Sequence, residues 1–234
     1  MNILIIDTST AAATVAITTA ERVLAASGFS GDRTLSVRLI PEIEHLLHLA
    51  GLAIADIDLF AAATGPGSFT GVRGGVATAQ GLALGHGRPC IGFSSLQLLA
   101  LNLPLAAVPV CALIDARKNE VYAGLYDCSR GLPSPLIEEC VTPPGEFLDL
   151  LTLRGHDTVI FCGDGVIRYR TQIEQHLGDK AVIAPFPCHQ PNAALAAPLV
   201  LRSWQNGDIL TPARLLPVYL RPSDAEINRA ARPA

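Results

Sequence analysis

The sequence has no C-x-x-C motif, although it contains six cysteines. The two nearest, Cys128 and Cys140, are twelve positions apart. This spacing argues against a zinc site of the ribbon or finger type and against a thioredoxin-type redox motif. We therefore expect reduced, buried thiols in a cytoplasmic protein.

The chain also lacks the patterns of a secreted or membrane-spanning protein. Its first residues, MNILIIDTST, have no basic segment, and Asp7 interrupts the apolar run. Every other apolar run meets a charged residue, proline or glycine well before the roughly 18 residues of a membrane-spanning helix. We expect neither a signal peptide nor membrane association.

An excess of positive charge is missing as well. Lysine and arginine number 17 against 21 aspartates and glutamates, which gives a net charge of −4 at pH 7. Proteins that hold nucleic acid by their own surface are usually basic. Any contact with RNA is therefore expected only through a partner complex.

What the sequence does have is half hydrophobic composition and an internal duplication. A run over residues 2–7 ends in an aspartate and is followed by two β-prone runs, 14–19 and 22–30, which predict an antiparallel meander. Residues 108–115 again form an apolar run ending in an aspartate, and an alternating strand follows up to 127. This repeat predicts two similar α/β lobes that face a cleft.

The duplication divides the chain into a first lobe at 1–103 and a second lobe at 104–234. Helical periodicity predicts long helices at about 34–50 and 70–86 in the first lobe. We expect the last helix of the second lobe to pack back on the first lobe.

Small residues recur at every fourth position of the helix at about 70–86. An interior glycine costs a helix about 1 kcal/mol relative to alanine, so close approach by another backbone is expected. That backbone belongs either to the chain's own sheet or to a partner subunit. In the second case the expected contact residues are Leu39, Ile43, Gly71, Arg73, Gly74, Gly75, Thr78, Ala79, Leu82 and Ala83.

The segment TGPGSFTGVRGG (64–75) has the composition of a phosphate-binding loop. It contains no lysine for a Walker A motif, Thr70 replaces the third glycine of G-x-G-x-x-G, and Pro66 rules out a nucleophile elbow at Ser68. Its amides still precede a helix N-terminus, which favours anions. The predicted residues for a vestigial nucleotide or anion contact are Asp7, Thr8, Ser9, Gly67, Ser68 and Asp115.

Asp7 and Asp115 end matching strands of the two lobes. Such carboxylates either hold a magnesium nucleotide in an ATP-dependent kinase or hydrolase, or cap the turns that follow them. His45 and His48 are three positions apart, but no H-E-x-x-H motif accompanies them. We expect no metal and no cofactor.

Five motifs together resemble the bacterial TsaB (YeaZ) family. They are ILIIDTST, TGPGSFTGVRGG, GRPCIGFSSL, LIDARKNEVYAGLYD and PVYLRPSDA, and they span nearly the whole chain. The resemblance implies an actin-like ASKHA fold and a part in N6-threonylcarbamoyladenosine (t6A) modification of adenosine 37 of tRNA. It also implies a heterodimer with the paralogue TsaD, a contact with the ATPase TsaE, a homodimer when alone, and an intermediate supplied by TsaC.

The resemblance further implies that this subunit performs no chemistry itself. TsaD binds metal through H-x-x-x-H, and Ser95 and Leu99 stand at the matching positions here. We therefore expect a non-catalytic scaffold, without metalloprotease or glycoprotease activity. The family often has a His-Ser pair where this chain has Thr34, Leu35 and Ser36, which leaves the details of the partner contact open.

Overall fold

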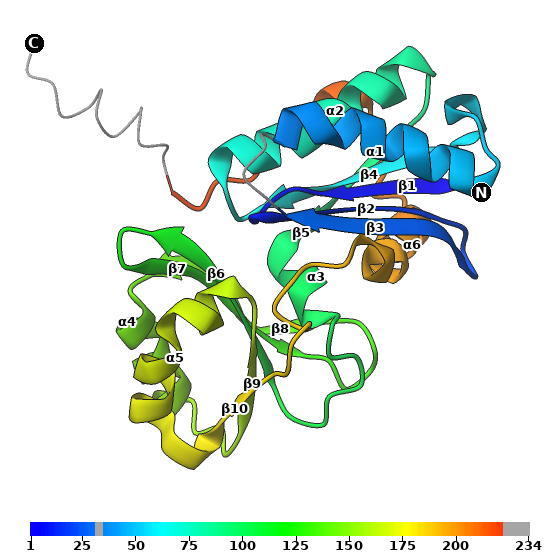
Figure 1. Ribbon diagram of the computed structural model, residues 1–234. Helices are drawn as coiled ribbons and strands as arrows, with labels where there is room; N and C mark the ends of the chain where they lie inside the picture. The colour runs from blue at the N-terminus through cyan, green and yellow to red at the C-terminus, as the bar shows by residue number, and fades with distance from the viewer. Residues whose placement is uncertain (31–34, 222–234) are drawn as a thin grey trace, which may run out of the picture.

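A computed structural model of the chain describes residues 1–30 and 35–221 and shows two lobes, one above the other (Figure 1). Thr34, one of the residues at the family's His-Ser position, lies outside this description, as do the side chains of Leu35 and Ser36. Within the described ranges, none of the helices combines the length and the hydropathy needed to cross a bilayer.

The first lobe is built on a five-stranded mixed sheet in the order β3-β2-β1-β4-β5. Strand β1 pairs antiparallel with β2 and parallel with β4, and every residue of β1 is buried. A strand covered on both faces must be apolar throughout, which is why residues 3–6 do not alternate. The strands are β1 (Ile3–Asp7), β2 (Ala12–Thr18), β3 (Val23–Ser30), β4 (Leu59–Gly65) and β5 (Cys90–Ser94).

Helices cover both faces of this sheet (Figure 1). On one face lie α1 (Leu35–Ala50) and α2 (Phe69–Gly85), and a short 3-10 helix (Ile54–Asp56) precedes β4. On the other face lie α6 (Ala197–Asn206) and the 3-10 turn before it, so the C-terminal part of the chain completes the core of the first lobe.

The second lobe repeats the arrangement. Its sheet has the order β10-β9-β6-β7-β8, and β6 pairs antiparallel with β7 and parallel with β9 just as β1 pairs with β2 and β4. This confirms the predicted duplication and the mixed, helix-flanked sheets of an actin-like fold. The strands are β6 (Val110–Arg117), β7 (Glu120–Asp127), β8 (Ser134–Thr142), β9 (Val159–Cys162) and β10 (Ala181–Ile183).

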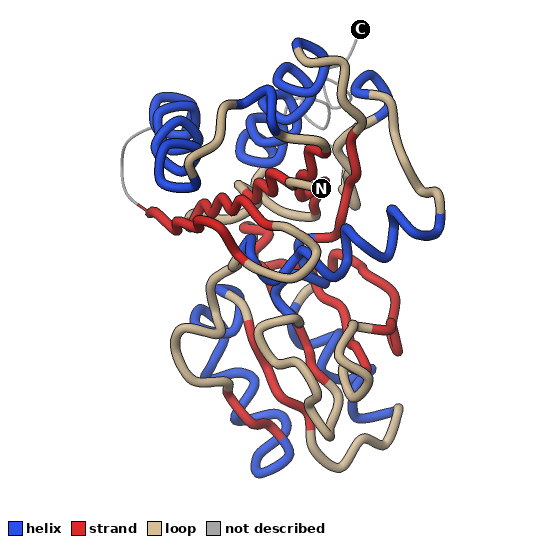
Figure 2. The backbone as a smooth tube through the Cα atoms, turned by 90° about the vertical axis from the view of Figure 1, so that its right-hand side faces the viewer, coloured by secondary structure: helices blue, strands red, loops and turns tan. Residues whose placement is uncertain are grey.

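Helices α4 (Pro144–Leu153) and α5 (Asp164–Leu177) cover the outer face of the second sheet, and α3 (Ser95–Ala100) lies between the lobes (Figure 1). The view at right angles shows the same two bodies stacked (Figure 2). All six cysteines are free thiols, four of them buried and Cys140 and Cys188 half-buried.

The last described segment, residues 215–221, crosses from the first lobe to the second, and we call it the C-terminal strap. Leu215 is fully buried in the first-lobe core, and the Val218 N–H donates to the Thr64 carbonyl at 2.7 Å. At the other end, Arg221 pairs with Glu120 and donates to the Ala116 carbonyl at 3.1 Å. The strap therefore ties both lobes together along one side of the cleft between them.

Candidate functional site: the cleft between the lobes

A cleft of about 410 Å³ opens between the two lobes. Its first-lobe wall consists of the turn between β1 and β2 and the start of α2, and its second-lobe wall is the end of β6 with the start of α5. The C-terminal strap lines one side. The volume lies in the range of small-molecule sites, so the geometry of the walls decides what the cleft can do.

Asp7 ends β1 and is fully buried behind the first wall. One carboxylate oxygen, Oδ1, accepts a hydrogen bond from the Ser9 N–H at 2.6 Å, whereas Oδ2 has no partner among the described residues. Burial raises the pKa of Asp7 from 3.8 to about 6, because the charged form loses its hydration. Asp7 thus caps its turn and carries an incompletely satisfied carboxylate.

The glycine-rich loop packs directly on that turn. The Ser68 N–H donates to the Ser9 carbonyl at 2.7 Å, and a Cβ at Gly67 would lie 2.3 Å from the same oxygen. A Cβ at Gly71 would lie 2.0 Å from the Thr8 carbonyl oxygen, while Thr8 Oγ1 donates to the Gly71 carbonyl at 2.7 Å. The glycines are therefore required for backbone-to-backbone contact within the chain, and the turn takes the space beside the loop.

Asp115 lies on the opposite wall and is neutralised by arginines. Its Oδ1 accepts from the Arg117 N–H at 3.0 Å, and its Oδ2 lies 3.2 Å from Arg168 Nη1 and 3.4 Å from Arg117 Nη1. The neighbouring Asp164 is mostly buried, which raises the pKa of its carboxyl. Two guanidinium groups on Asp115 leave little negative charge for a divalent cation, and no metal-ligand cluster occurs in residues 1–30 and 35–221.

The residues predicted for a nucleotide or anion contact gather as two groups. Asp7, Thr8 and Ser9 adjoin Gly67 and Ser68 on the first wall, and the remaining predicted residue, Asp115, faces them from the second. Asp7 caps the turn after β1, as in the structural alternative considered for it, whereas Asp115 lies two residues before the end of β6 and accepts from the Arg117 N–H at the irregularity before the hairpin turn. Binding of a nucleotide or anion stays a prediction.

Sequence reasoning missed a cluster at the first-lobe lip of the cleft. The Arg73 guanidinium carbon lies 3.7 Å from the centre of the Phe69 ring, and Arg73 Nε donates to Tyr219 Oη at 2.7 Å. The rings of Phe69 and Tyr219 stack with centroids 4.7 Å apart. No local signal could have joined them, because Tyr219 follows Arg73 by 146 positions and reaches it only through the strap.

The predicted partner residues divide between two faces of the helices, and most of them are buried within this chain. A Cβ at Gly75 would lie 2.4 Å from Thr8 Oγ1, so α2 sits too close to β1 for a larger side chain. The small-residue strip therefore serves the chain's own sheet and cannot be reached by a partner helix. The buried members are Leu39, Ile43, Gly71, Gly75, Ala79 and Ala83.

The opposite face of α1 and α2 is open to solvent, and we call it the outer face. Of the predicted residues, Gly74 is exposed on it and Thr78 and Leu82 are half-buried, whereas the exposed Arg73 lies at its edge and turns toward Tyr219 at the cleft. It also carries exposed apolar or small side chains that the sequence analysis did not select. These are Val37, Ile40, Leu49, Ala77, Gly81 and Leu84.

Comparison with known proteins gives a consistent family. Residues 23–197 match the family model of TsaD, tRNA N6-adenosine threonylcarbamoyltransferase. The chain is 32% identical over 226 residues to the tRNA threonylcarbamoyladenosine biosynthesis protein TsaB of Bacillus subtilis, which covers 97% of this chain and 96% of the relative.

Solved structures agree with the sequence match. A Pseudomonas aeruginosa protein, described as similar to the peptidase YEAZ, superposes with a TM-score of 0.81 and 33% identity over 94% of this chain and 99% of that one. Component A of (R)-2-hydroxyglutaryl-CoA dehydratase from Acidaminococcus fermentans has a TM-score of 0.50 at 15% identity, with 86% of this chain and 97% of that one covered. The latter shows a shared fold alone.

Proposed function

The chain belongs to the TsaB (YeaZ) family of tRNA threonylcarbamoyladenosine biosynthesis proteins, and from this membership we propose that it is a non-catalytic subunit supporting TsaD in t6A modification of tRNA. In this proposal it forms a heterodimer with TsaD, is joined by TsaE, and reaches tRNA through the complex. When TsaD is absent, the same surface would pair two copies of the chain.

The outer face of α1 and α2 is the observation that carries the proposal. Val37, Leu49 and Leu84 expose 62%, 61% and 74% of their surface there, although apolar residues of this size are usually buried. Between them, Gly74 and Gly81 have no atom within 4 Å of a Cβ position, which leaves room for a partner helix to approach closely. Such a face suits helix-to-helix packing with a subunit of similar fold.

Two features of the chain support a role without chemistry. Asp115, the carboxylate that faces the cleft, is held by Arg117 and Arg168. Ser95 and Leu99, at the positions of the TsaD histidines, are fully buried beside the second-lobe core. Asp115 is therefore not a free base for a substrate, and Ser95 and Leu99 offer no firm ligand to a metal.

Reconstitution of t6A formation with TsaC, TsaD and TsaE, with and without this chain, tests the proposal. We expect modification to require the chain, and Gly74→Arg to abolish both TsaD binding and modification, because a long side chain would stand in the helix contact. The control Leu153→Arg changes an exposed residue of α4, 83% exposed in the second lobe, and should behave as wild type. Normal TsaD binding by Gly74→Arg would refute the outer face as the docking surface.

A second candidate is an ATP-dependent kinase or hydrolase of the same fold that uses Asp7 and Asp115. The observation in its favour is the unpartnered Oδ2 of Asp7, a buried carboxylate oxygen at a strand end next to the cleft. ATP turnover by the isolated protein, lost in Asp7→Ala and Asp115→Ala, would establish this function. Loss of t6A formation in these variants with TsaD binding intact would also assign a required role to the cleft.

A further inference from the structure

We propose that the two lips of the cleft contact an unpaired loop of the RNA substrate while that RNA is held by the complex. The inference rests on the proposed function and adds a surface to it. The first-lobe lip consists of Phe69, Arg73 and Tyr219, and the second-lobe lip consists of Arg117, Lys118 and Arg168.

The first-lobe lip offers planar groups of the kind that bind unstacked bases. Arg73 is exposed with its guanidinium carbon over the Phe69 ring, and Tyr219 stacks on Phe69 with 43% of its surface exposed. The hydrogen bond from Arg73 Nε to Tyr219 Oη fixes the plane of the guanidinium. Bases of single-stranded RNA stack on aromatic rings and on arginine planes of this kind.

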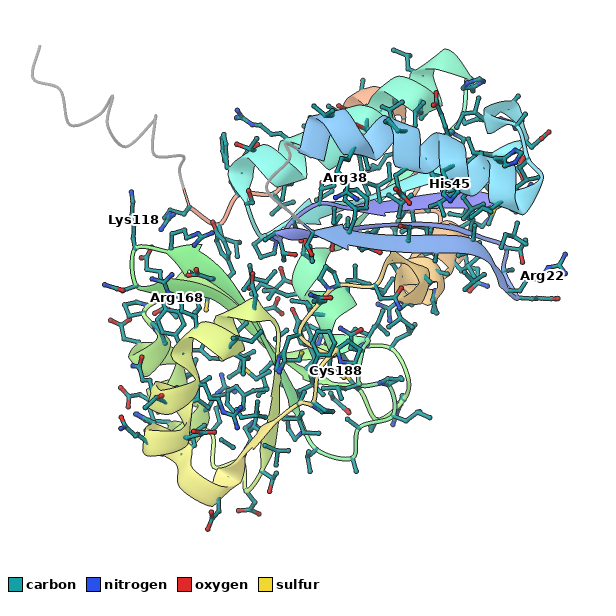
Figure 3. The ribbon with its side chains drawn as sticks, in the orientation of Figure 1. Arg22, Arg38, His45, Lys118, Arg168 and Cys188 are labelled. Carbon is teal, nitrogen blue, oxygen red and sulfur yellow. The ribbon has the colours of Figure 1, made fainter. Side chains whose placement is uncertain are left out.

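The second-lobe lip offers cations on a rigid turn. Arg117, Lys118 and Asn119 have φ values of 63°, 51° and 61°, which non-glycine residues seldom adopt. The backbones of Arg117 and Glu120 lie opposite each other in the hairpin and close the turn. Strained backbone of this kind persists where the fold or a function requires it. The turn carries Lys118 out beyond the end of the sheet, and Arg168 from α5 lies below it in the view of Figure 3.

Charge complementarity favours RNA as the occupant. The chain as a whole is acidic, yet Arg73, Arg117, Lys118, Arg168 and Arg221 gather around this cleft. Among the described residues, the carboxylates in the same place, Asp115, Glu120 and Asp164, are fewer, so this part of the lips carries an excess of positive charge. The excess is small, which agrees with an RNA contact that adds to binding by a partner and does not hold RNA alone.

The first-lobe lip lies close to the outer face, which gives a geometric reason for expecting RNA there. Arg73 and Phe69 lie in the first turns of α2, and Gly74 and Gly81 of the proposed TsaD surface lie on the same helix. A subunit docked on the outer face would therefore stand next to the first-lobe lip. RNA bound by that subunit could reach across to both lips.

The test measures KM and kcat for tRNA in the reconstituted system at several salt concentrations, with TsaD affinity measured separately. Lys118→Glu should raise KM for tRNA about five- to tenfold and reduce its salt dependence, because a phosphate contact is lost. The value of kcat and the TsaD affinity should not change. Lys180→Glu is the matched control, since Lys180 is exposed in the short 3-10 helix (Gly178–Lys180) that follows α5 and does not line the cleft, and it should match wild type.

Substitutions of Tyr219 test the first-lobe lip independently of Lys118. Tyr219→Ala should raise KM for tRNA by a similar factor because the stacking plane is lost, whereas Tyr219→Phe keeps the ring, loses only the hydrogen bond from Arg73, and should raise KM less than Tyr219→Ala does. Equal KM values for Lys118→Glu, Tyr219→Ala and wild type, with normal TsaD binding, would overturn this inference and leave the proposed function intact. Loss of TsaD affinity in these variants would assign the lips to a protein partner and overturn it too. If wild type does not support t6A formation, both proposals fail.

Discussion

At the scale of single residues, Asp7 is a buried carboxylate in an unfavourable environment. It is buried at the end of β1 with one oxygen capped by Ser9 and the other without a partner among the described residues. The pKa of Asp7 is about 6 in the folded protein and 3.8 in the unfolded chain. Between these two pH values the folded protein therefore holds a proton that the unfolded chain has lost. The ionised carboxylate therefore destabilises the fold.

The prediction is that Asp7→Asn stabilises the protein at neutral pH. In wild type the free energy of unfolding should fall as pH rises from about 4 to about 6, by on the order of 3 kcal/mol in total. The amide cannot ionise, so the variant should lose this dependence, match wild type near pH 4 and have the higher Tm at pH 7. Thermal unfolding across this pH range checks it, with Asp179→Asn on the surface as control. A constant Tm difference at all pH values would contradict the argument.

At the scale of elements, the two faces of α2 have different packing environments. Its glycines at 71 and 75 let the helix lie against β1 and the turn after it, whereas Gly74 and Gly81 face open space. The four-residue period in the sequence correctly indicated close backbone approach. It could not tell which backbone, because a strip of small residues looks the same whether a sheet or a partner helix covers it.

A pair of glycine substitutions separates the two faces. Gly75→Leu should destabilise the protein by about 1–3 kcal/mol or more, since the new side chain meets Thr8 Oγ1 and Ile6. Gly81→Ala should stabilise by about 0.5–1 kcal/mol, because the helix gains an alanine without a clash. Denaturant unfolding of both variants measures these changes in the free energy of unfolding. Equal changes for the two variants would refute the assignment of faces.

At the scale of the whole molecule, the sequence was sufficient for the repeated lobe and for a cleft between the lobes, and insufficient for the lips of that cleft. Strand ends at Asp7 and Asp115 and the alternation after residue 120 are local signals, so both meanders could be predicted. The lips could not, because Tyr219 and Arg221 reach them from the end of the chain. Arg168 likewise joins Asp115 only through the packing of α5 on β6.

The path of the chain predicts unequal autonomy of the two lobes. Residues 95–190 contain almost all of the second-lobe core, whereas the first-lobe sheet needs Ala193, Val200 and Leu215. A fragment of residues 95–190 should give the dispersed NMR spectrum of a folded protein. Residues 1–103 alone should not, because one face of their sheet would be bare. A folded spectrum from 1–103 would show that α6 is dispensable.

The same path has a consequence for synthesis on the ribosome. The first lobe emerges first, but its sheet waits for residues that are translated after the second lobe, while the second lobe can close in the meantime. The nascent chain therefore spends most of its synthesis with the lower face of β1 and β4 exposed, where Ile3, Ile5 and Leu59 will later be buried. Chaperone attachment should concentrate on that face and end when α6 leaves the exit tunnel.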